Sequence, residues 1–226
     1  MMAGVVAHAI GEVFAFGVGV ALSPLAIVAV VAMLVAPGGV RPALSFAVGW
    51  TASLALVATA VLLAAEGADP SEAGGPAPWV LVVKTVLGLL LLWLAAKQWR
   101  GRADDEGGKT AALMRKMDGI EAVKAAGVGV LFTVKPKNLL LAISAGLSLA
   151  PADSGPAVNA VALAVFVLIG SAGAWLPLAL RVISPERGHA ALLGLRDWMV
   201  RENATVIVTL CLVFAAKLLG DVLTKV

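Results

Sequence analysis

Long stretches without any charged residue are the feature that most limits what this chain can fold into. Such stretches cover residues 13–40, 42–65 and 154–180. Each is longer than the roughly 20 residues that an α-helix needs to cross about 30 Å of hydrocarbon. Further apolar segments at residues 79–96, 125–150 and 203–222 contain only one or two charges each. The pattern predicts an all-α integral membrane protein with six transmembrane helices.

The composition excludes most soluble classes. Hydrophobic residues make up 61% of the chain and charged residues 14%, whereas soluble domains have about 45–50% and about 25%. A net charge of +3 therefore points to membrane topology rather than to a nucleic-acid partner. The sequence has no GxxxxGK[ST] nucleotide loop, and His8 and His189 lie far apart without metal-ligand spacing. We expect no cofactor, no metal and no enzymatic activity.

Basic residues gather in alternate connections between the expected helices. The basic connections contain Arg41, then Lys97, Arg100, Arg102, Lys109, Arg115, Lys116 and Lys124, and finally Arg181, Arg187, Arg196 and Arg201. The intervening connections are acidic, with Glu66, Asp69, Glu72 and Asp153. Because positively charged loops stay in the cytoplasm, we expect a multi-pass protein of the cytoplasmic (inner) membrane with both termini outside.

The chain divides into two halves of three helices each. We expect the first three-helix unit in residues 1–98, a cytoplasmic linker in residues 99–123 and the second unit in residues 124–226. Within the linker, apolar residues recur at three- and four-residue spacing, at Leu113, Met117, Ile120 and Val123. This spacing fits an amphipathic interfacial helix, and a solvated linker with one helical turn is the alternative.

The two halves share a motif in their first helices. Each has a glycine pair followed by a proline in mid-span: Gly17, Gly19 and Pro24 in the first half, Gly127, Gly129 and Pro136 in the second. Proline removes a hydrogen-bond donor and interrupts a helix, leaving carbonyls that lipid cannot satisfy. We therefore predict broken first and fourth helices in two inverted three-helix repeats, with the prolines and glycines as breaks or hinges. A tolerated proline kink is the alternative for each position.

Charged residues within the apolar segments are the candidate site. A lysine near the bilayer centre costs about 2.5 to 3.5 kcal/mol and therefore suggests a function. The candidate substrate-binding residues are Lys135, Lys137, Asn138, Ser23 and Lys84. Lys84 and Lys217 also lie close enough to outer helix ends to snorkel. Because cations outnumber anions in these segments, we expect an anionic ligand with a phosphate, sulfate or carboxylate group. Glu12, near an outer helix end, is the candidate coupling residue.

Several segments resemble the GAP family, the glycopeptidolipid- and sulfolipid-addressing proteins of actinobacterial envelopes. They are residues 21–25 (Ala-Leu-Ser-Pro-Leu), 88–100, 117–120 (Met-Asp-Gly-Ile) and 135–141 (Lys-Pro-Lys-Asn-Leu-Leu-Leu). The resemblance extends over nearly the whole chain and implies a branch of the LysE-type exporter superfamily, with two inverted three-helix repeats. The chain departs from the family pattern at Lys135, where an asparagine is usual, and it lacks a Pro-x-Trp element before the Met-Asp segment.

The resemblance implies export of an envelope glycolipid or a related anionic amphiphile across the cytoplasmic membrane. Membrane lipids and that amphiphile are therefore the expected partners. Two alternatives remain open: LysE-like export of a small amino acid or other solute, and a non-transporting accessory role that scaffolds lipid-synthesis or export machinery. A homo-oligomer is also open.

Overall fold

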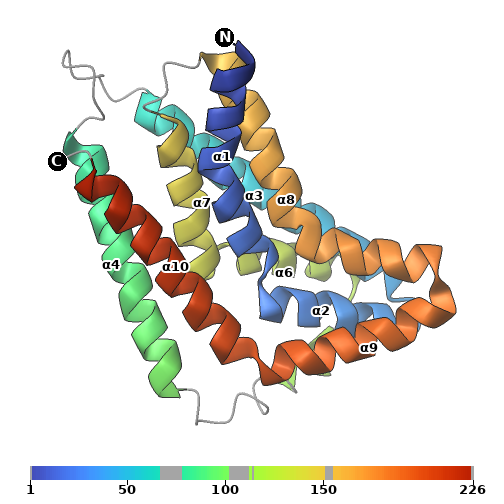
Figure 1. Ribbon diagram of the computed structural model, residues 1–226. Helices are drawn as coiled ribbons and strands as arrows, with labels where there is room; N and C mark the ends of the chain where they lie inside the picture. The colour runs from blue at the N-terminus through green and yellow to red at the C-terminus, as the bar shows by residue number, and fades with distance from the viewer. Residues whose placement is uncertain (1, 67–77, 102–111, 114, 151–154, 225–226) are drawn as a thin grey trace.

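The computed structural model describes residues 2–66, 78–101, 112–113, 115–150 and 155–224, and within these ranges it is all-helical (Figure 1). The helices are α1 Met2–Ala21, α2 Pro24–Val35, α3 Val40–Glu66, α4 Pro78–Arg100, α6 Ala122–Thr133, α7 Pro136–Leu149, α8 Pro156–Ile183, α9 Pro185–Arg201 and α10 Asn203–Leu223. The all-helical fold class expected from the sequence is confirmed.

Five of these helices are long and apolar enough to cross a membrane, namely α1, α3, α4, α8 and α10. Helices α6 and α7 meet at an angle of 68° and form a sixth span if the bent pair is counted as one. In Figure 1 both termini lie at one end of the bundle, and the last residues of α4 lie at the other. This arrangement fits an even number of crossings.

The charge-free stretch at residues 13–40 does not form one continuous helix. The candidate membrane span in this region is Gly4–Ala21 in α1, and α2 is a separate short apolar helix that lies across the end of the bundle (Figure 1). Ser23 has extended backbone angles, φ −99° and ψ 98°. The ring of Pro24 disfavours the helical region for the residue before it and has no N–H to continue the ladder. The chain therefore turns at this point.

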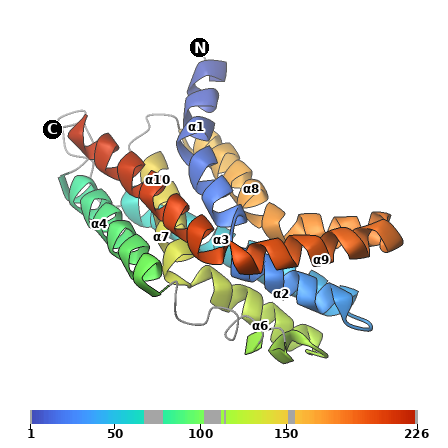
Figure 2. The ribbon, with the colours of Figure 1, turned by 60° about the horizontal axis from the view of Figure 1, so that its bottom comes forward.

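Close helix pairs form the interior of the bundle. Helix α1 packs along α8, α3 along α6, and α4 along α10, and the two central helices α3 and α8 also touch (Figures 1 and 2). Glycines permit two of these approaches. A Cβ at Gly173 of α8 would clash with the carbonyl of Ala21, and a Cβ at Gly49 of α3 would clash with that of Ala126. Small residues at such interfaces let membrane helices approach closely.

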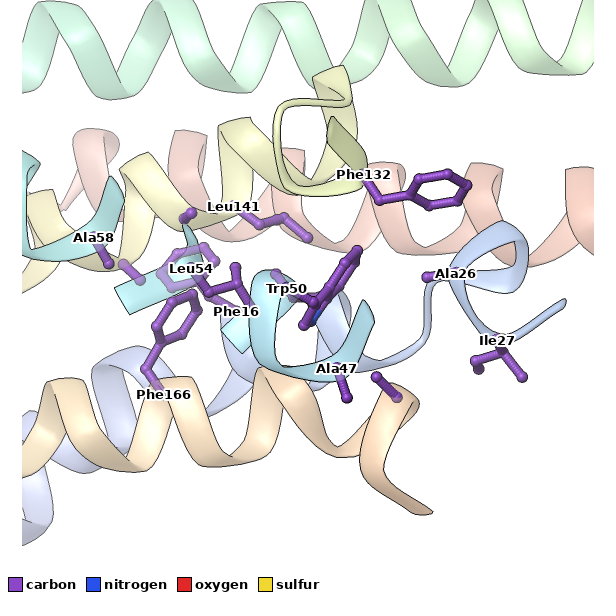
Figure 3. Close-up of a cluster of buried hydrophobic side chains, with 14 of the residues drawn as sticks. Phe16, Ala26, Ile27, Ala47, Trp50, Leu54, Ala58, Phe132, Leu141 and Phe166 are labelled. Atoms are coloured by element: carbon purple, nitrogen blue, oxygen red, sulfur yellow. The ribbon is translucent and has the colours of Figure 1, made fainter. Parts of the chain in front are cut away.

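Large apolar side chains fill the centre between these helices. Phe16 of α1, Trp50 of α3 and Phe166 of α8 are buried together (Figure 3). The indole Nε1 of Trp50 donates a hydrogen bond to the carbonyl of Gly170, at 3.2 Å. This bond satisfies the only polar group of the indole inside the core.

The structure contains a helix where the sequence analysis expects a basic loop. Helix α9 runs across the end of the bundle beside α2 (Figure 2). Its buried face includes Leu192 and Met199, whereas Asp197 and Trp198 are exposed. A helix that lies on a protein surface needs only a narrow apolar stripe. Because charged residues and Gly194 interrupt the apolar residues of α9, this stripe was not recognised in the sequence.

The linker lies only partly within the described residues. Residues 102–111 and 114 are outside them, so the predicted amphipathic helix stays a prediction. In the remainder, Met117 is buried, and Leu113 and Ile120 pack against the core. Val123, by contrast, is 84% exposed. This part of the connection therefore docks on the bundle.

Candidate substrate site at the two helix breaks

Two junctions between consecutive helices lie together, the one between α1 and α2 and the one between α6 and α7. Helix α1 ends at Ala21 and α2 begins at Pro24, while α6 ends at Thr133 and α7 begins at Pro136. A pocket of about 170 Å³ lies at the junction. It is lined by Ser23, Pro24, Leu25, Leu94, Gln98, Lys135, Pro136, Lys137, Asn138 and Ile207. The structure thus unites residues that stand more than a hundred positions apart in the sequence.

Lys137 is the central cation of this pocket. Its side chain is buried, with 7% exposure. The ammonium Nζ donates to the carbonyl of Gly19 at 2.7 Å and to that of Leu22 at 3.3 Å. The last carbonyls of a helix lack partners within the helix and carry its negative dipole end. Lys137 therefore caps α1, from a position near the start of α7.

Asn138 connects the two breaks. Its Nδ2 donates to the hydroxyl Oγ of Ser23 at 3.3 Å and to the carbonyl of Phe132 at 3.0 Å. Its Oδ1 is buried and has no hydrogen-bond partner among the described residues. A buried acceptor of this kind normally has a partner. The pocket therefore offers both a cation and an acceptor for a hydroxyl or amine.

Lys135 lines the same pocket but contacts a different group. Its Nζ lies 3.7 Å from the centroid of the Phe132 ring, in a cation–π contact. Nearby, the hydroxyls of Ser53 and Thr133 share a hydrogen bond of 2.6 Å. Thr133 is the last residue of α6, so this bond ties the end of α6 to α3.

The glycines before the prolines differ in their surroundings. A Cβ at Gly129 would clash with the carbonyl of Phe46, and one at Gly19 would clash with the ring of Phe214. At Gly17 a Cβ would lie 3.1 Å from the side chain of Ile169, which is a tight contact. At Gly127 it would meet no atom within 4 Å in the described structure. Close packing at these positions thus involves Gly17, Gly19 and Gly129.

Lys84 and Glu12 lie away from this pocket. Lys84 is buried on α4, with 3% exposure, and is not part of the pocket lining. Glu12 lies inside the span Gly4–Ala21, not at its outer end as the sequence suggested. Its Oε2 accepts from Lys217 Nζ at 3.4 Å, and Lys217 also pairs with Asp221 at 3.3 Å. The cluster therefore joins α1 to α10.

Sequence reasoning did not identify the residues of α4 and α10 that line the pocket. Gln98 and Leu94 come from the end of α4, and Ile207 comes from the start of α10. Gln98 has no distinctive local pattern, and its place in the pocket follows only from the packing of α4 against α10. Among the described residues, no group of three or more His, Cys, Asp or Glu side chains could hold a metal ion.

These features define a multi-span α-helical membrane protein with a cationic pocket at the junctions of α1 with α2 and of α6 with α7. A family model described as Sap, sulfolipid-1-addressing protein, matches residues 13–224. The chain belongs to this family, and the sulfolipid-addressing resemblance found in the sequence is confirmed. No curated protein and no solved structure matches the chain.

Proposed function

We propose that this protein exports an anionic envelope lipid, or a related amphiphile, across the cytoplasmic membrane. The observation that carries the proposal is the buried Lys137, placed at the junction of two interrupted helices from opposite halves of the chain. An intramembrane cation is costly and usually functional. Membership in the sulfolipid-addressing family and the five to six candidate spans support a role in lipid export.

We also propose that the two halves are inverted repeats, as in the LysE-type superfamily. In such a repeat, α1 of the first half corresponds to α6 of the second, α3 corresponds to α8, and α4 corresponds to α10. The contact of α1 with α8 then becomes that of α6 with α3, while the pairs α3–α8 and α4–α10 map onto themselves. The observed packing contains all of these pairs. Helix α9 has no counterpart among the described residues of the first half.

In this proposal the pocket holds the acidic part of the headgroup. The ammonium of Lys137 would exchange a carbonyl of α1 for a phosphate, sulfate or carboxylate oxygen, which forms a stronger charge-assisted bond. The free Oδ1 of Asn138 would accept a bond from a headgroup hydroxyl. A ligand with both groups satisfies the pocket better than a simple anion. Loss of the cap on α1 would at the same time loosen the break at Ser23 and Pro24.

The pocket size limits what can enter it. A volume of about 170 Å³ holds about five water molecules at roughly 30 Å³ each. An acidic group fits, whereas acyl chains do not, so in lipid export the chains would stay in the bilayer while α4 and α10 separate. The small volume also favours a second candidate, LysE-like export of a small amino acid or other solute. An accessory role without transport is the third.

A reconstitution assay tests the proposal. Liposomes with the protein receive fluorescent phosphatidic acid in one leaflet, and dithionite quenching measures its movement to the other. We expect wild type to accelerate this movement and Lys137→Met to reduce the protein-dependent rate by about tenfold or more, since a charge-assisted contact is worth more than about 1.4 kcal/mol. Lys137→Arg should keep part of the rate. Lys124→Met is the control, because Lys124 pairs with Glu121 and is not among the residues that line the pocket.

The same liposomes separate the alternatives. Circular dichroism first verifies that the Lys137→Met variant is folded. Movement of lipid at the rate of protein-free vesicles would contradict lipid export. Protein-dependent release of an encapsulated amino acid would then support the small-solute exporter, and absence of both activities would support the accessory role.

A further inference from the structure

A second pocket lies at the end of the bundle away from the termini. Its volume is about 380 Å³. It is formed by the end of α2, by α9 and by the connection that precedes α6. The lining residues are Ala32, Val35, Ala36, Pro37, Arg115, Asp118 and Arg196. It shares no residue with the pocket at the helix breaks.

The polar part of this pocket is mainly cationic. Its described lining includes two arginines, Arg115 and Arg196, and one carboxylate, Asp118. Arg196 uses Nε and Nη2 to contact Asp197, at 2.9 Å and 2.7 Å, and its other N–H groups make no hydrogen bond to the described residues. Arg115 and Asp118 form no ion pair within the described part of the chain. The guanidinium of Arg115 is therefore available to a ligand, and that of Arg196 keeps further N–H groups beside its contact with Asp197.

The pocket also has an apolar side and lies where lipid headgroups would be. Ala32, Val35 and Pro37 form the apolar part of the lining. Helices α2 and α9 run across the bundle end (Figures 1 and 2). Trp198 of α9 is 46% exposed, and tryptophan is enriched at membrane–water interfaces. An amphiphile could thus place its acid on the arginines and its apolar part on α2.

We infer that this pocket is a docking site for the phosphate- or sulfate-bearing headgroup of an anionic lipid. Arginine binds such groups through paired N–H donors in a planar fork. The site lies on the face that carries the basic connections and would collect the lipid before it reaches Lys137. The inference rests on the proposed function only for this order of events. Binding itself requires no transport.

Native mass spectrometry of the full-length protein, titrated with phosphatidic acid in detergent, tests the site. We expect the double variant Arg115→Gln, Arg196→Gln to weaken the apparent affinity by about tenfold, which corresponds to about 1.4 kcal/mol. Asp118→Asn should strengthen it, because Asp118 is the one carboxylate among the described lining residues. A general loss of folding cannot produce this opposite change. Lys124→Gln is the control, since Lys124 pairs with Glu121 outside the pocket.

Each result decides the proposal. Equal weakening by Lys124→Gln and by the double arginine variant would overturn it, and so would weaker binding by Asp118→Asn. Inorganic phosphate is added in a parallel titration. If millimolar phosphate displaces the lipid completely, the site binds free anions and the lipid assignment is wrong. Lys137→Met should retain this binding, so failure here and failure of lipid export remain distinguishable.

Discussion

The two helix breaks have the same backbone design and different chemistry. In both, a proline begins the second helix, and the residue before it makes no side-chain capping bond. The first break carries Ser23, Pro24 and Leu25, whereas the second carries Lys135, Pro136 and Lys137. The break in the second half thus supplies both cations, and the break in the first half supplies the carbonyls that Lys137 contacts.

The difference shows that the first half contributes backbone carbonyls and the second half contributes the lysine that they contact. The helix end in the first half is a negative dipole end, and it compensates a lysine that would otherwise be buried without a partner. Lysines at the matching positions of the first half would add further cations to a pocket that already contains two. A functional site between similar halves therefore needs unlike residues at matching positions.

The largest expected effect comes from two glycines at close helix contacts, Gly49 of α3 against α6 and Gly173 of α8 against α1. Gly49→Ala and Gly173→Ala each place a methyl group against a backbone carbonyl that cannot rotate away. We expect each change to destabilise the protein by up to about 3 kcal/mol, as overpacking does. Thermal unfolding in detergent measures the effect.

Gly127→Ala is the control, since a Cβ there has free space in the described structure. If the halves are equivalent, the two glycine variants lose similar stability. A large loss in only one of them would show that the halves pack differently.

A smaller effect is expected at the contact between the central helices. Trp50→Phe removes the hydrogen bond to the carbonyl of Gly170 and leaves that carbonyl without this partner. We expect a loss of about 1 kcal/mol in denaturant unfolding followed by fluorescence. Trp198→Phe changes an exposed side chain and should be neutral. An unchanged midpoint for Trp50→Phe would show that α3 and α8 do not depend on this bond.

The smallest effect on stability is expected at the ion pairs. One of them joins two distant helices, and another lies within a single segment. Glu12 links α1 to α10 through Lys217, whereas Glu121 pairs, among the described residues, with Lys124 three residues further along. Glu12→Gln should cost less than about 1 kcal/mol, and high salt should reduce the cost. Glu121→Gln should cost nothing measurable in the same thermal unfolding. Equal losses of stability in Glu12→Gln and Glu121→Gln would mean that the ion pair between α1 and α10 contributes no more than an ion pair within one segment.

Much of the site was predictable because its residue types are unusual in apolar segments. Lys137, Asn138 and Ser23 stand beside prolines in stretches that otherwise lack polar groups, and the structure places them around one pocket. Lys84 carried the same signal but lies elsewhere. Periodicity along one helix does not reveal which other helix faces a given residue, so the sequence could not separate these cases.

The sequence by itself determined the class of fold. Apolar stretches must be helical in a bilayer because every backbone group needs a partner there, and proline removes one such partner at each break. Only the tertiary structure decided the pairing of Lys137 with the end of α1, the course of α9, and the meeting of Arg115 with Arg196. These depend on contacts between segments distant in the chain, where small differences in packing choose among many arrangements with the same local pattern.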